Sequence, residues 1–390
     1  MTGSAEPTPP AAGPAPLRLT QIVASLEARH GGPSRSVRGL STAQAAAGHT
    51  VELLTTAVGA VGEAVAEGNL TVRTFAREWP AALAPSAPLR RHLRDSAPEI
   101  VHHHGLWLRP LHYAHEAARR TGVPLVISPR GMMSPWAWSH RRWKKALADH
   151  FIHPGALAGA AGWHATSAGE ANDIRRLGFT QPVCLAPNGV AAVPEADNAA
   201  AAAHWQERWP ELRRRPAALF HSRFHVMKRP LELIDLWAAC APRDWLLLLV
   251  GIPEQYSVPQ LQAYVRRAGL QDRVAVFDGT DQLPPYAAAT LFLLPSHTEN
   301  FGLVVAEAMA RSLPVLATET SPWQGLEAEG AGRCVPWYGF GAALTALLTE
   351  GPAVLQERGR RARAWALRDY SWKKSAGTLA AFYSELRTRR

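Results

Sequence analysis

The chain has 390 residues, which is long for one hydrophobic core and predicts two domains. Its net charge of +10 indicates an anionic partner: a nucleic acid, an anionic membrane or a phosphorylated substrate. The three scattered cysteines form neither a CxxC motif nor a disulfide framework, which indicates a reducing, cytoplasmic compartment. The longest apolar run, residues 245–252, is too short to span a bilayer, so only peripheral membrane contact is expected.

Residues 1–16 are small and proline-rich and lack a cationic, apolar signal segment, so we expect a disordered tail. From residue 17 to about residue 190, candidate strands, loops and helices alternate at a regular spacing. This alternation predicts an α/β fold with a doubly wound parallel sheet. Ligands of such sheets bind beyond the carboxyl ends of the strands, so residues at strand ends are the candidates for function.

The first strand is expected over residues 17–24 and leads to the loop Gly31-Gly32-Pro33-Ser34. Two glycines before a helix allow the backbone to approach a ligand closely, although an ordinary turn explains them equally well. Arg35 and Arg38 follow on the same predicted helix and are interpreted as solvated charges.

Three histidines end the strand predicted over residues 100–104. The two-residue period of a strand places His102 and His104 on one face and His103 on the other. One interpretation is that they are surface histidines at a strand end. A metal site is the weaker alternative, because no carboxylate or cysteine lies nearby in the sequence.

Arg130 and Gly131 follow the strand predicted over residues 123–128, a position that suits a loop facing an anion, although Arg130 as a solvated charge is the open alternative. Further along, Ser167 and Glu170 have the spacing of a helix capping box, with Ser167 as N-cap and Glu170 three positions later. We interpret this pair as structural.

The segment 136–151 is basic and aromatic. Drawn as one helix, it places Trp136, Trp143, Leu147 and Phe151 on one face and cations beside and opposite them. Tryptophan flanked by cations is typical of a helix at an anionic membrane surface. The alternative is a helix that packs the same apolar stripe on its own sheet, with the basic side solvated.

Residues 191–215 are alanine-rich and then charged, and we interpret them as a linker that merges into a short helix. A strand is then predicted over residues 217–222, and Pro230 is well placed at the first position of the next helix. Arg223 and Lys228 lie between the two, at the carboxyl end of the strand. A guanidinium and an ammonium there suit a pair of phosphates, although both can also be solvated.

Glu299 and Glu307 are separated by seven residues, after the apolar strand TLFLLPS and around the start of a helix predicted over residues 303–311. Glu299 is therefore expected at a strand end and Glu307 about two turns into the helix. One carboxylate could accept hydrogen bonds from a sugar and the other from a ribose. The free backbone N–H groups between them would face a diphosphate. Two unrelated solvated glutamates are the simpler alternative.

The surrounding stretch HTENFGLVVAEAMARSLPVLATETSPW closely resembles the signature region of retaining glycosyltransferases of family 4, also called group 1. That family has two facing Rossmann-like domains, the GT-B architecture. The resemblance implies an acceptor domain over residues 17–190, a nucleotide-sugar donor domain over residues 191–370 and a helix over residues 371–390 that crosses back to the first domain. Two positions depart from the family pattern: Ser222 precedes Arg223 where glycine is usual, and Arg311-Ser312 replaces a small-residue pair.

The resemblance also implies roles for individual residues. Catalytic roles fall to four of them, Glu299, His104, Arg223 and Lys228. The donor side comprises Glu307, Arg223, Lys228, Asn300, Phe301, Gly302 and Gly32. His104 and Arg130 face the acceptor.

The implied function is retaining transfer of a hexose from a nucleotide-diphosphate sugar to a saccharide or lipid-linked saccharide, in cell-surface polysaccharide or glycoconjugate synthesis. The family is thought to use front-face attack, so that no protein nucleophile is needed. No Asp-x-Asp pair occurs in the chain, so neither a metal nor another cofactor is expected. A nucleotide-sugar epimerase on the same fold and a non-catalytic polyanion-binding protein are the alternatives. No nucleic-acid-binding motif supports the second alternative.

Overall fold

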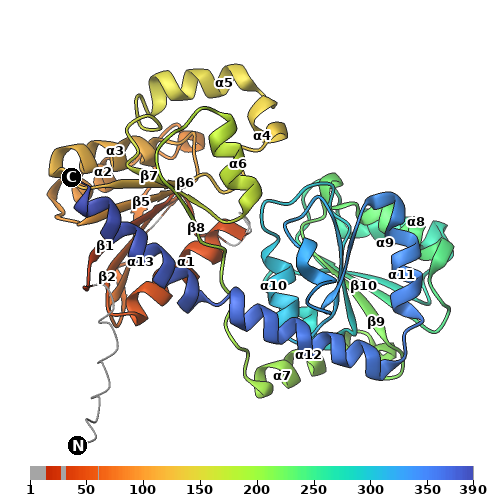
Figure 1. Cartoon of the computed structure of the whole chain (residues 1–390). Coiled ribbons are helices and arrows are strands. Elements are labelled where there is room, and N and C mark those ends of the chain that lie inside the picture. The colour runs from red at the N-terminus through yellow and green to blue at the C-terminus, as the bar shows by residue number, and fades with distance from the viewer. Residues whose placement is uncertain (1–14, 28–31, 60, 390) are drawn as a thin grey trace, which may run out of the picture.

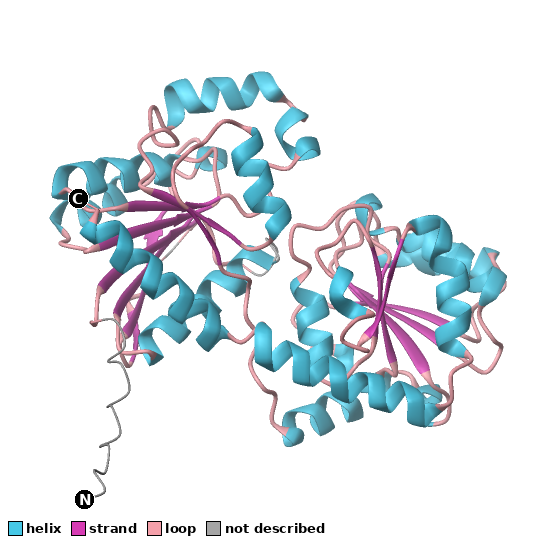
Figure 2. Ribbon diagram, in the orientation of Figure 1, coloured by secondary structure: helices cyan, strands magenta, loops and turns pink. Residues whose placement is uncertain are grey.

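The protein has two α/β lobes, each built around a parallel sheet with helices on both faces (Figures 1 and 2). The structure is a computed structural model that describes residues 15–27, 32–59 and 61–389. The predicted tail and residues 28–31 of the glycine loop therefore lie outside the described residues, apart from positions 15 and 16. The two doubly wound sheets confirm the predicted fold class.

The first sheet has the strand order β3-β4-β2-β1-β5-β6-β7-β8 among the described residues. Its strands pair in parallel, except that β3 and β4 are antiparallel. The strands are β1 (Arg18–Val23), β2 (Thr50–Ala57), β3 (Val65–Glu67), β4 (Leu70–Ala76), β5 (Ile100–His104), β6 (Leu125–Ser128), β7 (Gly162–Ala165) and β8 (Val183–Leu185). The helices that follow them in this half are α1 (Gly32–Ala46), α2 (Ala87–Asp95), α3 (Arg109–Thr121), α4 (Pro135–Ser139), α5 (Arg142–Leu147) and α6 (Ala168–Arg176).

The second sheet is parallel throughout its described strands, in the order β11-β10-β9-β12-β13-β14. These strands are β9 (Ala217–His221), β10 (Leu246–Gly251), β11 (Val274–Asp278), β12 (Leu291–Leu294), β13 (Val315–Thr318) and β14 (Gly332–Val335). The helices of this half are α7 (Glu195–Arg208), α8 (Pro230–Cys240), α9 (Val258–Arg267), α10 (Leu303–Ala310), α11 (Phe340–Leu348) and α12 (Pro352–Asp369). The final helix of the chain is α13 (Trp372–Thr388).

Both sheets reverse their winding direction at one point. In the first sheet, β1 lies between β2 and β5, and in the second, β9 lies between β10 and β12. Ligands of doubly wound sheets bind at such reversal points, beyond the carboxyl ends of the strands. The residues that follow β5, β9 and β12 are therefore the ones that the fold places at the two binding positions.

The chain crosses between the lobes twice, and the two crossings meet at Val190. Its N–H donates to the carbonyl of Tyr370 at 2.6 Å, and it forms a parallel bridge with Ser371. A Cβ atom at Gly189 would lie 2.4 Å from the backbone nitrogen of Trp372, so only glycine allows this approach. Beyond it, α13 returns to the first sheet and packs beside α1, as Figure 1 shows in blue and red.

Two predictions about individual segments are wrong. The segment 191–215 was expected to be a linker merging into a short helix, but most of it is helix α7, Glu195–Arg208, because Trp205 anchors it in the core of the second lobe. Residues 136–151 do not form one helix. The chain breaks between α4 and α5 at Arg141, whose φ is +52°, and then continues into a π-helical turn, Ala148–Ile152.

Candidate active site

Glu299 follows β12, and two neighbours donate hydrogen bonds to its side chain. Its Oε1 accepts hydrogen bonds from the ammonium of Lys228 and from Ser296 Oγ, the latter at 2.9 Å. The side chains of Lys228 and Glu299 are only 12% and 11% exposed, so the two charges face each other largely out of water. Lys228 comes from the loop after β9, and Glu299 follows β12. Their ion pair therefore joins the ends of these two neighbouring strands at the reversal point of the second sheet.

The loop after β13 supports the Glu299 segment from behind. Trp323 is fully buried and donates from Nε1 to the carbonyl of Phe301 at 2.7 Å, while Thr320 Oγ1 donates to the carbonyl of Ser296 at 3.0 Å. Gly302 has a φ of +75° immediately before α10, a conformation that favours glycine. No side chain caps this end of α10 among the described residues, so its first backbone N–H groups remain available to an anion.

Glu307 is the fifth residue of α10, just over one turn from its start rather than the two turns predicted. Tyr286 donates its hydroxyl to Glu307 Oε2 at 2.5 Å. Burial, and then the Glu307 carboxylate, raise the pKa of Tyr286 well above its usual value, so the phenol stays protonated. The other oxygen, Oε1, lies 2.6 Å from Arg35 Nη2 of α1. The Arg35 side chain is 52% exposed, as expected of a solvated charge, but the sequence interpretation missed this ion pair.

Arg223 has a different environment from Lys228, although both follow β9. Its guanidinium pairs with Glu254 at 3.0 Å, and these two side chains are 45% and 40% exposed. The structure therefore pairs Lys228 with Glu299 but pairs Arg223 with Glu254 instead. Gly32 begins α1 in the first lobe and is exposed, and no atom of the described residues lies within 4 Å of where its Cβ would be.

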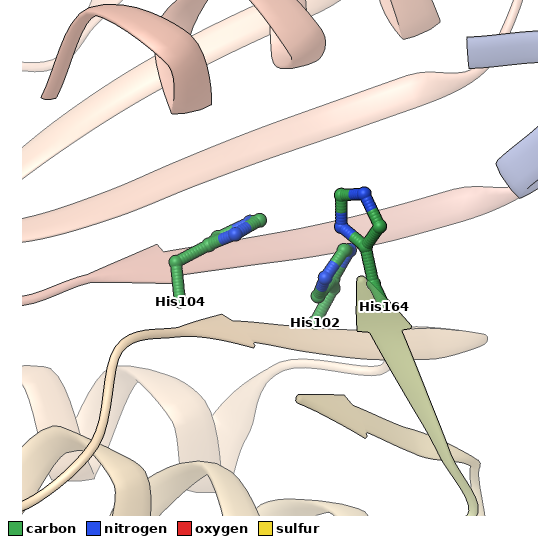
Figure 3. Close-up of side chains that lie close together, drawn as sticks. All are labelled: His102, His104 and His164. Atoms are coloured by element: carbon green, nitrogen blue, oxygen red, sulfur yellow. The ribbon is translucent and has the colours of Figure 1, made fainter. Parts of the chain in front are cut away.

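The histidines of β5 are buried, so the expectation of surface histidines is wrong. His102 and His104 lie on one face, as predicted, with ring centroids 4.2 Å apart, and the His103 ring hydrogen-bonds separately to the carbonyl of Gly105. Figure 3 shows His164 of β7 beside His102, with His104 on the other side of His102. One ring nitrogen from each of His102, His104 and His164 lies within 4.8 Å of the other two, close enough to consider a metal ion.

The hydrogen bonds of this histidine cluster do not favour a metal site. Each of the six ring nitrogens has a protein partner within 3.0 Å, and one partner is the guanidinium of Arg130, at 2.9 Å from His104 Nδ1. A metal ion would have to displace several of these bonds and would lie beside a cation. We interpret the cluster as a buried hydrogen-bond network.

Arg130 lies at the end of β6 with a φ of +56°. Its Nη1 donates to Asn188 Oδ1 at 2.7 Å, its Nη2 donates to His104, and its buried Nε has no partner among the described residues. Burial lowers the pKa of the guanidinium to about 10, so Arg130 remains cationic at neutral pH. The alternative of a solvated Arg130 is therefore wrong.

Glu170 holds the Arg130 loop instead of closing a capping box. Ser167 does cap α6, accepting from the N–H of Glu170 at 3.1 Å. The Glu170 carboxylate, however, accepts from Gly131 N at 2.6 Å and from both Thr166 N and Thr166 Oγ1, at 2.7 and 2.8 Å. The structural interpretation thus covered Ser167 but missed the contact of Glu170 with the Arg130 loop.

Asn300 connects the two halves of the site. Its Nδ2 donates to Thr166 Oγ1 at 2.9 Å, which places the residue next to Glu299 against the loop after β7. A Cβ atom at Gly131 would lie 3.0 Å from Asn300 Cβ, so the Arg130 loop is in direct contact with Asn300 as well. The candidate residues of the two sheets therefore meet at one place.

Five residues at this place were not singled out as functional from the sequence: Arg35, Glu170, Tyr286, His164 and Gln21. Most of them act through partners more than 20 residues away, such as Tyr286 with Glu307, and no local pattern marks them. Only for Arg35 did the sequence contain a usable indication of function. Arg35 lies three residues after Gly32, near the start of a helix that follows a parallel strand, and ligands of such sheets bind there.

Two family models match the chain, one in each half. Residues 31–189 match the Glycosyl transferase 4-like domain, and residues 215–350 match Glycosyl transferases group 1. A curated relative, D-inositol 3-phosphate glycosyltransferase of Xylanimonas cellulosilytica, is 28% identical over 184 residues. That alignment covers 45% of this chain and 43% of the relative, so the chain matches less than half of the relative's length.

Solved structures match over almost the whole chain. Sucrose-phosphate synthase from Thermosynechococcus elongatus superposes with a TM-score of 0.73 at 21% identity, covering 95% of this chain and 99% of the other. Anabaena HepE, in complex with UDP-glucose, gives a TM-score of 0.72 at 17% identity, covering 95% and 100%. At sequence identities this low, the structural match shows a shared fold and nothing more specific. Together with the two family models, it shows that the chain belongs to the group 1 glycosyltransferases of GT-B fold.

Proposed function

We propose that this protein transfers a sugar from a nucleotide-diphosphate sugar to a saccharide or lipid-linked saccharide, with retention of anomeric configuration. The observation that carries this proposal is the meeting of the two reversal points. Asn300, the neighbour of Glu299 in the chain, contacts Thr166 and the Arg130–Gly131 loop of the first sheet. Lys228 pairs with Glu299 on one side of this contact, and His104 pairs with Arg130 on the other. Donor and acceptor groups placed at these two edges would be adjacent.

The donor is assigned to the second sheet. Glu307, with Tyr286 behind it, offers a fixed carboxylate to ribose hydroxyls, and binding there would exchange the Arg35 contact for the nucleotide. Lys228 and the uncapped start of α10 would receive the diphosphate. Glu299 would accept hydrogen bonds from the sugar hydroxyls. The HepE complex with UDP-glucose supports a uridine nucleotide as the first donor to test.

In the proposed reaction, the bond between the anomeric carbon and the diphosphate oxygen breaks while the acceptor hydroxyl oxygen bonds to that carbon from the same face. The acceptor proton passes to the departing diphosphate. Lys228 and the α10 N–H groups would stabilise the charge that develops on the diphosphate, and losing one such donor typically raises the barrier by about 3–4 kcal/mol. This scheme needs no protein nucleophile, and we propose that it needs neither a metal nor another cofactor.

The α4–α5 segment favours a lipid-linked acceptor. Trp136, Trp143, Leu147 and Phe151 are 56%, 64%, 47% and 64% exposed, so these apolar side chains do not pack on the sheet. Exposed cations flank them, namely Arg141, Arg142 and Lys144. Apolar groups beside cations match an anionic lipid surface, so we propose peripheral contact at the cytoplasmic face of a membrane. No helix of the described residues is long and apolar enough to cross a membrane.

Product analysis tests the proposed function. The protein is incubated with UDP-, GDP- and dTDP-sugars and a set of saccharide acceptors, and released nucleotide and the anomeric proton of the product are followed by NMR. We expect nucleoside diphosphate release that depends on acceptor, and a product with the anomeric configuration of the donor. Glu299→Ala is expected to lose about 10²–10³-fold in turnover without unfolding, whereas Glu319→Ala, an exposed glutamate after β13, keeps it.

Three outcomes would contradict the proposal. A product with the opposite anomeric configuration to the donor would show that the enzyme does not use a retaining mechanism. Interconversion of the nucleotide sugar without any acceptor would indicate an epimerase. Salt-dependent binding to DNA with no turnover of any nucleotide sugar would indicate a polyanion-binding protein.

A further inference from the structure

A continuous chain of side-chain hydrogen bonds begins at Arg130 and leads away from the candidate active site. Arg130 Nη2 contacts His104 Nδ1 at 2.9 Å, and His104 Nε2 contacts Gln21 Oε1 at 2.7 Å. Gln21 Nε2 then donates to Gln44 Oε1 at 2.8 Å, and Gln44 Nε2 donates to the Tyr383 hydroxyl at 3.2 Å. In four steps the chain passes from the end of β6 through β5, β1 and α1 to the final helix, α13.

The same chain continues from Tyr383 back into the sheet. The Tyr383 hydroxyl lies 2.6 Å from His102 Nδ1, and His102 Nε2 lies 2.8 Å from Ser128 Oγ. Ser128 Oγ contacts His164 Nδ1 at 2.6 Å, and His164 Nε2 contacts the carbonyl of Ala186 at 2.8 Å. Tyr383 is therefore the junction between the Arg130–His104 end and the His102–His164 end.

Only one set of proton positions satisfies every bond of this chain. A guanidinium can only donate, so His104 Nδ1 must accept and His104 Nε2 must carry the proton. The carbonyl of Ala186 can only accept, so His164 Nε2 must donate to it and His164 Nδ1 must accept from Ser128. The Tyr383 hydroxyl accepts from Gln44 and donates to His102 Nδ1. Along the chain from Arg130 to Ala186, each group therefore donates a hydrogen bond to the next group in the chain.

Burial keeps this arrangement in its neutral form. Gln21, Gln44 and Tyr383 are 0% exposed, and the three histidines of the chain are at most 3% exposed. Burial lowers the pKa of His102 and of His104 well below the usual value and that of His164 to about 3. A proton added to any of these rings would place two donors against each other.

We propose that Tyr383 is a positioning residue that orients His104 and Arg130 for transfer, which rests on the function proposed above. Arg130 has no hydrogen-bonding carboxylate among the described residues, and its direction depends on Asn188 and on the lone pair of His104 Nδ1. That lone pair is available only while His104 donates to Gln21, and the amide of Gln21 is in turn oriented through Gln44 by the Tyr383 hydroxyl. A residue of the last helix thereby supports the His104 tautomer that the contact with Arg130 requires.

Tyr383→Phe tests this role because it removes the hydroxyl and keeps the buried ring. The matched control is Tyr113→Phe, which removes another buried hydroxyl whose contact is to the backbone N–H of Ser86. We expect Tyr383→Phe to lower kcat about tenfold with an unchanged Kd for nucleoside diphosphate, and Tyr113→Phe to leave kcat within about twofold. Equal losses of kcat in the two variants would overturn the proposal.

A second variant distinguishes a connected chain from a general loss of stability. Gln44→Met breaks the chain one step closer to His104. If both residues act through the same chain, the double variant with Tyr383→Phe loses no more activity than the more affected single variant. Losses that multiply would overturn the proposal.

The tautomer of His104 gives a readout that does not require transferase activity. In ¹⁵N NMR spectra of the intact protein, wild type and Tyr113→Phe are expected to show His104 protonated at Nε2, and Tyr383→Phe to show a shift towards the mixed-tautomer position. An unchanged His104 signal in Tyr383→Phe would overturn the proposal even in an active enzyme. If wild type transfers no sugar but the signal shifts, the proposed function fails while the hydrogen-bond chain stands.

Discussion

Arg35 of α1 and Glu307 of α10 form an ion pair that joins the two lobes, with Arg35 Nη2 at 2.6 Å from Glu307 Oε1. The Glu307 side chain is 11% exposed and the Arg35 side chain 52%. The carboxylate assigned to the donor ribose is thus already engaged by a cation of the other lobe. A nucleotide that takes Glu307 must therefore displace Arg35 or share the carboxylate with it.

Removal of this ion pair is expected to let the two lobes separate more often. A partly exposed pair contributes about 0.5–1 kcal/mol, so Arg35→Gln should raise the ratio of open to closed molecules roughly two- to fivefold. Small-angle X-ray scattering of the ligand-free protein should then give a larger radius of gyration. Arg38→Gln is the control, because Arg38 pairs with Glu67 inside the first lobe. Identical scattering of Arg35→Gln and wild type would show that the pair does not hold the lobes together.

Lys228→Ala is expected to weaken binding of a nucleoside diphosphate much more than binding of the nucleoside. The Lys228 ammonium is nearly buried beside Glu299, where a charge contributes more than at the surface. We expect a loss of about tenfold or more for the diphosphate and less than twofold for the nucleoside, measured by calorimetry.

Arg223→Ala should show the same preference with a smaller effect, because Arg223 is 45% exposed and paired with Glu254. If either variant lost the same affinity for the nucleoside as for the nucleoside diphosphate, the substituted residue would not bind the phosphates. A larger loss in Arg223→Ala than in Lys228→Ala would show that Arg223 leaves Glu254 to bind the donor.

The buried histidines predict a fold that loses stability in mild acid. Burial lowers the pKa of both His103 and His164 from 6.5 to about 3. Between these values the unfolded chain binds protons that the folded chain does not, so the free energy of unfolding falls as pH falls. The slope approaches about 1.4 kcal/mol per pH unit for each such histidine.

Urea unfolding at pH 7, 6, 5 and 4 measures this slope. Above pH 7 the histidines contribute no pH dependence, because they are neutral in both states. His164→Gln keeps one donor and one acceptor. It should make the slope of the unfolding free energy between pH 6 and pH 4 shallower by up to about 1.4 kcal/mol per pH unit, the amount for one proton. A variant with the wild-type slope would show that His164 is not held neutral by the fold.

The exposed apolar side chains of residues 136–151 are expected to bind anionic vesicles. Wild type should sediment with liposomes that contain phosphatidylglycerol and not with phosphatidylcholine alone, and salt should weaken the binding. Replacing Arg141, Arg142 and Lys144 by Gln should remove it without unfolding. Lys145 is left in place, because its ammonium donates to the carbonyls of Trp138 and His140 and so supports the segment. Wild type that stays in the supernatant at low salt would favour a soluble acceptor.

The sequence predicted those parts of the site that are local in the chain. The strand over 100–104, the helix beginning at Pro230 and the Glu pair around the start of α10 follow from short patterns, and the structure has them at those places. His102 and His104 on one face followed from strand period alone. These features depend on neighbours within a few residues, which a sequence displays directly.

What the sequence did not predict depends on distant partners. The burial of Arg130 results from Asn188 and from β5, and the pairing of Arg35 depends on how the two lobes meet. Residues 136–151 have a helical pattern, but the backbone breaks at Arg141 and leaves the apolar side exposed. Periodicity shows that a stripe exists and does not show whether anything covers it.

Thermal unfolding of wild type with a panel of nucleotides is the most direct test of the donor assignment. UDP, GDP, dTDP and the corresponding nucleosides are compared, with inorganic diphosphate as a control. A ligand at 100 times its dissociation constant should add roughly 2.7 kcal/mol of stability. We predict that one nucleoside diphosphate raises the unfolding temperature by several degrees, and that Glu307→Ala abolishes most of the rise. No shift with any nucleoside diphosphate or its sugar would contradict the assignment of Glu307, Glu299 and Lys228 to a nucleotide-sugar site.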